Sequence, residues 1–363
     1  MKVLHLSSEK SWRGGEQQIA YLIEQSREHG VISMVACRAG SAFESYCIKN
    51  SILYFSLPFS SSLDISTAYQ VAKICRHHQI DLIHMHSGKS HMIGVMSHYF
   101  NNSPMLILSR RVDFPVRNST ISKWKYNHPS IKKIICVSNA IEEILRSSLK
   151  KPEICSTIHS GIDLNRFRNI VESKNLKLEF GVANNHWLVG NTSALADHKD
   201  YFTFVDVAKL ADAQKLPITF IIIGDGPQNK PIQQYIKKNK LNHRIILTGF
   251  KKDIPNLLPS LDLFLMTSKT EGLGTSILDA FACKVPVVAT AAGGIPEMVI
   301  HEKTGLLSPV GNAANLLKNI QLILNSPAFT EKIKENAFQL LTNKFTKEKM
   351  AQNTYMIYQE ICK

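Results

Sequence analysis

The sequence predicts two α/β domains, each built on a doubly wound parallel sheet. The chain has 363 residues, more than one ordinary α/β core uses, so two domains of roughly 150–200 residues are expected. Short apolar runs alternate with amphipathic stretches, which is typical of a parallel sheet wrapped by helices. This alternation stops once, in a polar stretch at 163–185, and then begins again. We interpret that stretch as the linker region.

The elements can be assigned in order from these runs. In the first series, strands are expected at 3–6, 32–37, 52–57, 82–86, 105–108, 134–137 and 154–158, with helices that include 16–29, 65–78 and 140–146. In the second series, strands are expected at 187–192, 218–223, 245–247, 261–266 and 285–289, followed by helices that end with 347–362. We therefore expect an N-terminal domain over 1–165, a C-terminal domain over 166–345, and a last helix over 346–363 that packs back toward the N-terminal domain. Domains of this type bind ligands at the C-terminal ends of their strands, here facing the cleft between them.

The composition excludes several other classes of protein. Hydrophobic residues make up 44% and charged residues 20%, which excludes a disordered or fibrous chain. No apolar run approaches the ~20 residues of a membrane-spanning helix, and the N-terminus enters a strand rather than a signal peptide. The seven cysteines are scattered and form no C-x-x-C pair, which fits reduced thiols in the cytoplasm.

The charge indicates an anionic partner, because the formal net charge is +14. Both halves share the excess, but one stretch at 110–133, which we call the basic segment, holds seven Lys or Arg residues and one Asp. Trp124 and Tyr126 lie inside it. Three interpretations stay open: a solvated basic surface, contact with an anionic membrane or acceptor lipid, and nucleic-acid binding, which no accompanying motif supports.

The most informative motif runs from Glu271 to Asp279 and follows the predicted strand at 261–266. Gly272 and Gly274 let the backbone pass close to a ligand, and a helix that starts there presents unpaired N–H groups to an anion. Glu271 stands at the turn, where its carboxylate can accept hydrogen bonds from sugar hydroxyls. Asp279 follows inside the helix, where its carboxylate can accept hydrogen bonds from hydroxyls at another end of the same ligand. The alternative is a plain strand–turn–helix with a solvated Glu271.

Several short motifs, in this order, resemble those of the retaining glycosyltransferase family four, the group 1 glycosyl transferases. The donor-binding signature of that family has two Glu residues separated by seven positions, then a Gly-x-Pro-Val-Val strand and a Gly-Gly-x-x-Glu turn. Here Glu271 and Asp279 are followed by KVPVV at 284–288 and GGIPE at 293–297. Further matches are GGE at 14–16, DLIHMH at 81–86, VSNAI at 137–141, IHSGID at 158–163, DHKD at 197–200, GDGP at 224–227 and KTGLL at 303–307. The resemblance covers nearly the whole chain and implies the GT-B fold, two Rossmann-like domains facing an interdomain cleft.

The resemblance also implies roles for single residues. Glu271 would hold hydroxyls of the transferred sugar, and Lys199 would neutralise the diphosphate of the donor. Gly15 would bring the backbone of the N-terminal domain close to the phosphates. The second Glu of the family binds the ribose of the nucleoside; Asp279 replaces it here and is one methylene shorter. The backbone N–H groups that would face the sugar and the diphosphate belong to Gly272, Leu273, Gly274, Thr275 and Ser276.

Two positions depart from the family pattern. The family commonly has an Arg a few residues before the Lys; Ala194 stands there, so Lys199 would depend on a cation from elsewhere. The family also often has a His after a strand of the N-terminal domain, where this chain has Arg110 and Arg111. Either arginine is a candidate cation for the acceptor or the cleft, but neither can act as a base. His86 is the nearest matched histidine, with a catalytic or an ordinary hydrogen-bonding role.

The activity implied by the resemblance is transfer of a sugar from a nucleotide diphosphate sugar with retention of anomeric configuration and without a protein nucleophile. The chain has no Asp-x-Asp motif, so we expect no metal and no cofactor beyond the nucleotide sugar as co-substrate. The expected acceptor is an anionic lipid or glycan, such as a lipopolysaccharide or polysaccharide precursor. Peripheral association with the inner face of the cell membrane is expected, and a nucleic-acid partner is not.

Three other functions compete with this interpretation. A sugar-nucleotide epimerase or a phosphorylase of the same fold would also bind nucleotides or phosphate in the cleft. A dehydrogenase would need a Gly-x-Gly-x-x-Gly turn after an early strand, which neither 11–16 nor 224–227 provides. A non-catalytic lipid- or nucleic-acid-binding protein would not need the intact Lys199 and Glu271.

Overall fold

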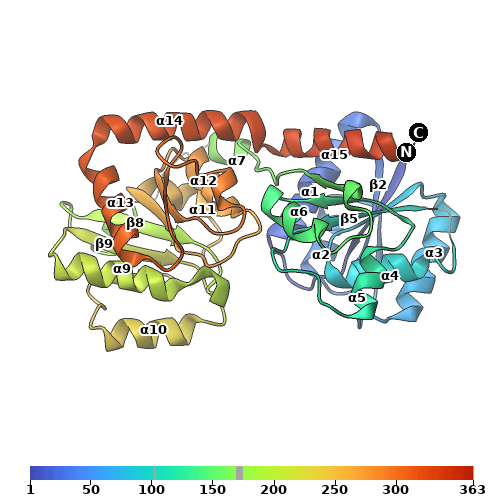
Figure 1. The fold of residues 1–363 in the computed structure, drawn as a ribbon, viewed down its shortest axis with the longest axis horizontal. Coiled ribbons are helices and arrows are strands. Elements are labelled where there is room, and N and C mark those ends of the chain that lie inside the picture. The colour runs from blue at the N-terminus through green and yellow to red at the C-terminus, as the bar shows by residue number, and fades with distance from the viewer. Residues whose placement is uncertain (102–103, 169–174, 363) are drawn as a thin grey trace. The chain divides into compact units, whose positions relative to one another are not determined.

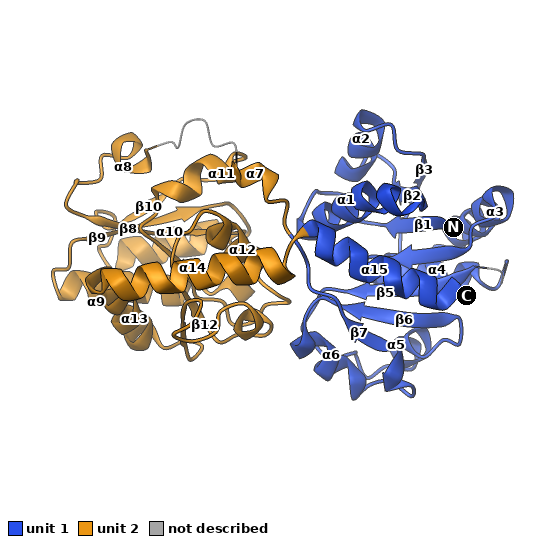
Figure 2. Ribbon diagram, turned by 90° about the horizontal axis from the view of Figure 1, so that it is seen from above, with its two compact units in different colours: residues 1–161, 347–363 blue, residues 162–346 orange. Residues whose placement is uncertain are grey.

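The computed structural model describes residues 1–101, 104–168 and 175–362. The chain forms two compact units (Figures 1 and 2). Unit 1 consists of Met1–Gly161 and Lys347–Lys363, and unit 2 consists of Ile162–Thr346. Each unit contains one parallel sheet with helices packed around it, which confirms the predicted α/β class.

Unit 1 has a seven-stranded sheet in the order β3-β2-β1-β4-β5-β6-β7. Its strands are β1 (Lys2–Ser7), β2 (Ile32–Arg38), β3 (Tyr54–Leu57), β4 (Leu82–Met85), β5 (Met105–Arg110), β6 (Ile131–Cys136) and β7 (Cys155–Thr157). Its helices are α1 (Gly14–Ser26), α2 (Ala42–Lys49), α3 (Ile65–His78), α4 (Gly88–Ser97), α5 (Thr120–Tyr126), α6 (Asn139–Arg146) and α15 (Lys347–Cys362). The strand order reverses between β1 and β4, and open α/β sheets bind ligands at such a point.

Helix α15 is part of the unit 1 core, although it comes last in the sequence. It runs beside α1 (Figure 2). Tyr358 of α15 is fully buried and packs in one apolar cluster with Tyr21 of α1 and Val3 of β1. Its hydroxyl also forms a hydrogen bond of 2.5 Å with Nδ1 of His84 on β4. The C-terminal segment therefore completes the apolar cover of the β1–β4 region.

Unit 2 has a six-stranded sheet in the order β10-β9-β8-β11-β12-β13. Its strands are β8 (Trp187–Thr192), β9 (Ile218–Ile223), β10 (Ile245–Leu247), β11 (Leu263–Met266), β12 (Val287–Thr290) and β13 (Leu306–Ser308). Its helices are α7 (Asn165–Arg168), α8 (Leu176–Glu179), α9 (Tyr201–Ala213), α10 (Asn229–Lys238), α11 (Ile254–Leu257), α12 (Thr275–Ala282), α13 (Ala313–Asn325) and α14 (Pro327–Lys344). Strand β9 is buried along its whole length, as expected for a continuous apolar run at the centre of a parallel sheet.

Some details differ from the sequence-based expectations. The stretch predicted as linker contains α7 and α8, two single-turn helices, while 169–174 lie outside the described residues. Strand β13 was not predicted, because three residues are too short for an apolar pattern to be recognised. The strand predicted at 82–86 ends at Met85, which leaves His86 just past the sheet edge. Among the described residues, every helix is too short or too polar to cross a bilayer.

Candidate active site

The motif that begins at Glu271 lies between β11 and α12, beside the point where the unit 2 strand order reverses. Gly274 is the N-cap of α12 and has a φ of 91°, a backbone conformation that favours glycine. No side chain in the described part of the chain caps this helix. The first N–H groups of α12 are therefore available to an anion.

The turn that contains Gly293 and Gly294 packs against the backbone of Glu271. Gly293 has a φ of 52°, and a Cβ atom at this position would lie 2.0 Å from the carbonyl oxygen of Glu271. The N–H of Gly294 donates to the same oxygen over 3.0 Å. A larger residue at 293 would have to displace the Glu271 backbone, so the GGIPE motif has a physical reason for its first glycine.

Glu271 and Lys199 form an ion pair. Nζ of Lys199 donates to Oε1 of Glu271, and Oγ of Ser268 donates to the same oxygen over 2.8 Å. Both partners are largely buried, with 15% of the Lys199 side chain and 8% of the Glu271 side chain exposed. The structure thus brings together two predicted site residues that are 72 positions apart.

The backbone around Lys199 is tied to the loop that carries Glu271. Lys199 ends a 3-10 turn at Asp197–Lys199. The N–H of Lys269 donates to the carbonyl of His198 over 2.8 Å, and Oγ1 of Thr267 donates to the carbonyl of Lys199 over 3.2 Å. Because these bonds join the two loops directly, the ammonium and the carboxylate are positioned before a ligand binds.

Asp279 lies on α12 and is half-buried. Burial raises the pKa of its carboxyl group to about 6, and the Arg166 guanidinium opposes part of that rise. Within the described residues, no hydrogen bond or ion pair joins Asp279 to Glu271 or Lys199. The carboxylates of Glu271 and Asp279 are therefore not bonded to each other. This is compatible with each of them binding a different end of one ligand.

In unit 1, the structure distinguishes between the two candidate arginines. A Cβ atom at Gly15 would lie 3.7 Å from Cδ of Arg111, so these two predicted residues are neighbours. Arg110 instead donates from Nη1 to the Tyr126 hydroxyl and from Nη2 to the Phe114 carbonyl. Its guanidinium also lies 5.3 Å from the centre of the Tyr126 ring. Arg110 therefore holds the segment after β5 in place through these bonds, whereas the Arg111 side chain lies beside Gly15.

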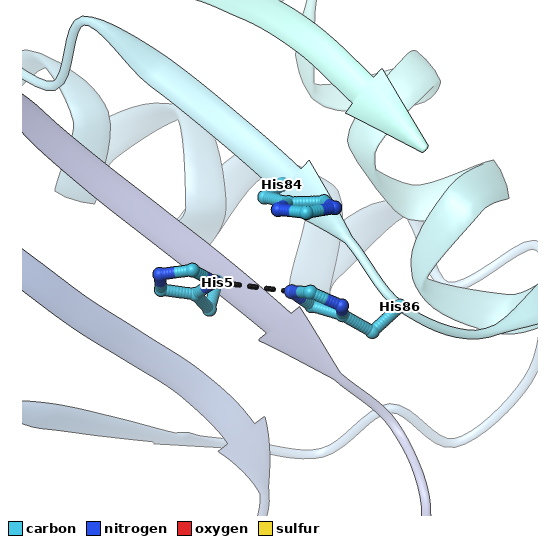
Figure 3. A group of neighbouring side chains, drawn as sticks. All are labelled: His5, His84 and His86. Atoms are coloured by element: carbon cyan, nitrogen blue, oxygen red, sulfur yellow. Dashed lines mark hydrogen bonds between the residues drawn. The ribbon is translucent and has the colours of Figure 1, made fainter. Parts of the chain in front are cut away.

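His86 belongs to a buried group of three imidazoles, His5, His84 and His86, which we call the histidine cluster (Figure 3). Nδ1 of His5 and Nε2 of His86 share a hydrogen bond of 3.0 Å. The rings of His84 and His86 lie 4.0 Å apart between centroids. Burial lowers the pKa of all three, to about 3 for His5 and well below the ordinary value for His84 and His86. At neutral pH the cluster is uncharged.

The histidine cluster is poorly arranged for a metal ion. Both ring nitrogens of His84 are already used, Nδ1 with the Tyr358 hydroxyl and Nε2 with Oγ of Ser109 over 2.8 Å. The rings are stacked or tilted against one another, with an interplanar angle of 23° between His5 and His86 (Figure 3). Ligands to one ion need nitrogen lone pairs that converge, which stacked rings do not provide.

The basic segment does not form one charged patch. Arg110 is buried, and Arg111 and Lys125 are half-buried. Lys133 forms an ion pair of 3.2 Å with Glu360 of α15. The exposed cations are Arg117, Lys123 and Lys132. Exposed apolar side chains lie among them: Val112, Phe114, Ile121 and Trp124. The segment is therefore an amphipathic surface with fewer exposed charges than the sequence suggested.

Comparison with known proteins agrees with this geometry. The family model described as Glycosyltransferase Family 4 matches residues 12–166, and the model Glycosyl transferases group 1 matches residues 173–340. Together they cover both Rossmann-like units, and the second contains Lys199, Glu271 and Asp279. The chain belongs to glycosyltransferase family 4. The predicted family assignment is thus confirmed.

Individual relatives of this glycosyltransferase have known or named activities. It is 24% identical to the N-acetyl-α-D-glucosaminyl L-malate synthase of Bacillus anthracis, over 82% of this chain and 79% of the relative. It is also 24% identical to the UDP-Gal:α-D-GlcNAc-diphosphoundecaprenol α-1,3-galactosyltransferase of Escherichia coli, over 75% of this chain and 74% of that protein. The crystal structure of Anabaena HepE in complex with UDP-glucose superposes with a TM-score of 0.87 at 24% identity, over 99% of this chain and 100% of that one. The last likeness confirms the GT-B fold.

Sequence reasoning did not single out several residues that contact the candidate site residues. Ser268 donates to Glu271 but has no distinctive spacing of its own. His5 contacts His86 from a strand whose short apolar pattern gave no reason to single out a histidine. The sequence carried no signal for this contact, because it depends on the β1–β4 register, which places His5 directly opposite His84.

Proposed function

We propose that this glycosyltransferase moves a sugar from a nucleotide diphosphate sugar to an acceptor with retention of anomeric configuration. The observation that carries the proposal is the buried Lys199–Glu271 pair beside the uncapped N-terminus of α12. Lys199 and the helix N–H groups supply positive charge for a departing diphosphate. Glu271 supplies an acceptor for sugar hydroxyls. A site for an anion and a site for hydroxyls therefore lie side by side.

The reaction then proceeds on one face of the sugar. The bond between the anomeric carbon and the diphosphate oxygen breaks, and its electron pair stays on the diphosphate. The acceptor oxygen forms the new bond on the same face and passes its proton to that departing oxygen. Lys199 stabilises the developing negative charge, and Glu271 holds the sugar in position. Since Lys199 and the N-terminus of α12 both supply positive charge for the diphosphate, we further propose that transfer needs no metal ion.

We also propose an anionic lipid or glycan as the acceptor, such as a lipopolysaccharide or polysaccharide precursor at the inner face of the cell membrane. The supporting feature is the exposed apolar set of the basic segment, which includes Phe114, Ile121 and Trp124, next to Lys123. Such a mixture of aromatic, apolar and basic groups suits the surface of an anionic bilayer. The E. coli relative is named for a diphosphoundecaprenol acceptor, which is also an anionic lipid.

The test is a screen of nucleotide sugars by thermal shift, followed by incubation of the best donor with lipid extract. We expect one donor to stabilise the protein and to label a lipid product. Lys199→Ala should weaken binding of the nucleotide diphosphate at least tenfold, because no arginine replaces it at Ala194. Lys237→Ala, which removes an exposed lysine of α10, is the matched control and should change nothing. Unchanged nucleotide affinity in Lys199→Ala would contradict the proposed donor site.

A further inference from the structure

Unit 1 contains a pocket of about 500 Å³ at the C-terminal ends of β4 and β5, where the strand-end residues His86, Arg110 and Arg111 line it. We call it the unit 1 pocket. Among the described residues that line it, five are Lys or Arg and a single one, Glu9, is acidic. The cations come from three segments: Lys89 from α4, Arg110, Arg111 and Arg117 from the end of β5 and the stretch after it, and Lys125 from α5. A hollow of this size with so uneven a charge favours an anionic ligand.

Three residues that line the pocket each have a buried side-chain nitrogen without a hydrogen-bond partner among the described residues. Nδ1 of His86, Nε of Arg110 and Nε of Arg111 form no hydrogen bond with any described residue. His86 is 7% exposed and Arg110 is 3% exposed. Native structures seldom leave a buried donor unsatisfied without a ligand or water nearby, because nothing then replaces its lost hydration. Three such atoms on one pocket indicate a ligand that accepts hydrogen bonds.

The hydrogen bond between His5 and His86 leaves two possible positions for the one N–H of these two rings that it does not use. Each neutral imidazole carries one N–H, and one of the two is used in the bond between them. The other must lie on Nε2 of His5 or on Nδ1 of His86, the two ring nitrogens without a described partner. His5 is fully buried, whereas His86 lines the pocket. Of these two nitrogens, only Nδ1 of His86 belongs to a residue that lines the pocket, so a bound acceptor oxygen favours the tautomer with the N–H at that atom.

Helix α4 adds further donors. It begins at Gly88, and both Gly88 and Lys89 line the pocket. The first N–H groups of a helix have no partner within it, and its N-terminus carries partial positive charge. A Cβ atom at Gly88 would meet nothing within 4 Å, so a ligand can approach the backbone there. Helix N–H groups, arginines and lysines together are the groups that bind phosphate in proteins.

The cations of the pocket also repel one another. Burial lowers the pKa of the Lys125 ammonium, and the charges of Arg110 and Arg117 lower it further. Burial likewise lowers the pKa of Arg111 to about 10. An anion in the pocket would relieve both the repulsion and the loss of hydration.

We propose that the unit 1 pocket binds the phosphate or diphosphate group of the acceptor, so that the acceptor is a phosphate-bearing molecule. This inference rests on the proposed function, since it assigns the pocket to the second substrate of that reaction. Arg111, Lys125 and His86 bind the phosphate oxygens.

Binding of inorganic pyrophosphate tests the pocket by calorimetry. All variants are made in the Lys199→Ala background, so that the proposed donor site in unit 2 does not contribute. We expect Arg111→Gln and Lys125→Met each to weaken pyrophosphate binding tenfold or more. The matched control is Lys123→Met, which lies on the same helix two positions away and lines a different hollow; it should stay within twofold. Equal affinity in all three variants, or no pyrophosphate binding to their parent, would overturn the proposal.

Two further measurements separate this inference from the proposed function. Farnesyl diphosphate binding more tightly than pyrophosphate would support a lipid phosphate as the natural ligand, and equal affinities would support a water-soluble one. Transfer to a phosphate-bearing acceptor at the same rate in wild type and Arg111→Gln would overturn the pocket assignment and leave the proposed function standing. Pyrophosphate binding that depends on Arg111, in a protein that transfers sugar from no nucleotide donor, would support the pocket as a phosphate site and overturn the proposed function.

Discussion

Removing one partner of the Lys199–Glu271 pair should destabilise unit 2, and removing both should not. In Glu271→Gln the Lys199 ammonium stays in place with only 15% of its side chain exposed and no carboxylate beside it. Breaking a buried ion pair in this way costs about 3–5 kcal/mol, and we expect the lower end because Lys199 keeps some contact with water. Such a loss is a large share of a typical free energy of unfolding of ~5–15 kcal/mol. The double variant Glu271→Gln/Lys199→Met has no unpaired charge and should recover to within about 1 kcal/mol of wild type.

Urea unfolding followed by tryptophan fluorescence can measure this effect in unit 2 alone. The chain has three tryptophans, Trp12, Trp124 and Trp187, and only the last lies in unit 2. A Trp12→Phe/Trp124→Phe background therefore reports the unfolding of unit 2 through Trp187. We expect a coupling energy of about 2–3 kcal/mol in the double-mutant cycle. Single-variant losses that simply add up in the double variant would show that the pair does not form in solution.

Three further predictions concern other parts of the molecule. The pKa of Asp279 is raised from 3.8 to about 6 on folding, so its ionisation destabilises unit 2 as the pH rises through 4 to 6. Asp279→Asn should therefore stabilise unit 2 at pH 7, by up to about 3 kcal/mol in urea unfolding. The same variant should bind the nucleotide more weakly. A lower free energy of unfolding in Asp279→Asn would count against the raised pKa. The histidine cluster has lowered pKa values, so the stability of unit 1 should be full above pH 6.5 and fall below it, by about 1.4 kcal/mol per pH unit for each imidazole. Stability that stays level from pH 6.5 to 5, measured through Trp12 fluorescence, would contradict the neutral cluster. Finally, co-sedimentation with anionic vesicles should occur at low salt, disappear near ~0.5 M salt, and decrease in Phe114→Ser/Ile121→Ser; equal binding to neutral vesicles, or none to either, would favour a soluble acceptor.

The sequence was sufficient to predict the sheets, because long apolar runs such as β9 repeat between amphipathic helices. It also predicted Lys199 and Glu271 as site residues, since each lies in a recognisable motif. Their pairing was not predictable, because it depends on how the turn at Asp197–Lys199 packs against the loop after β11. The motif assigned each side chain to a ligand, whereas the folded chain pairs them with each other.

Linear charge density was a poor guide to the surface. Seven cations between 110 and 133 suggested one basic face. Strand β5 carries Arg110 into the interior, and α15, which folds back onto unit 1, supplies Glu360 to Lys133. The histidine cluster shows the same limit, because the parallel register of β1 and β4 places His5 opposite His84 over a separation of 79 residues. Register and long-range return of the chain are properties of the packed core, and local sequence does not reveal them.

We propose that the Lys199–Glu271 site supports retaining, metal-independent transfer from a nucleotide diphosphate sugar. Proton NMR of the product, formed from an α-linked donor in excess chelator, tests it most directly through the coupling constant of the anomeric proton. We expect an α-linked product at an undiminished rate, and a loss of ~30- to 1000-fold in Glu271→Ala, which corresponds to about 2–4 kcal/mol in the transition state. A β-linked product, or full activity in Glu271→Ala, would contradict it.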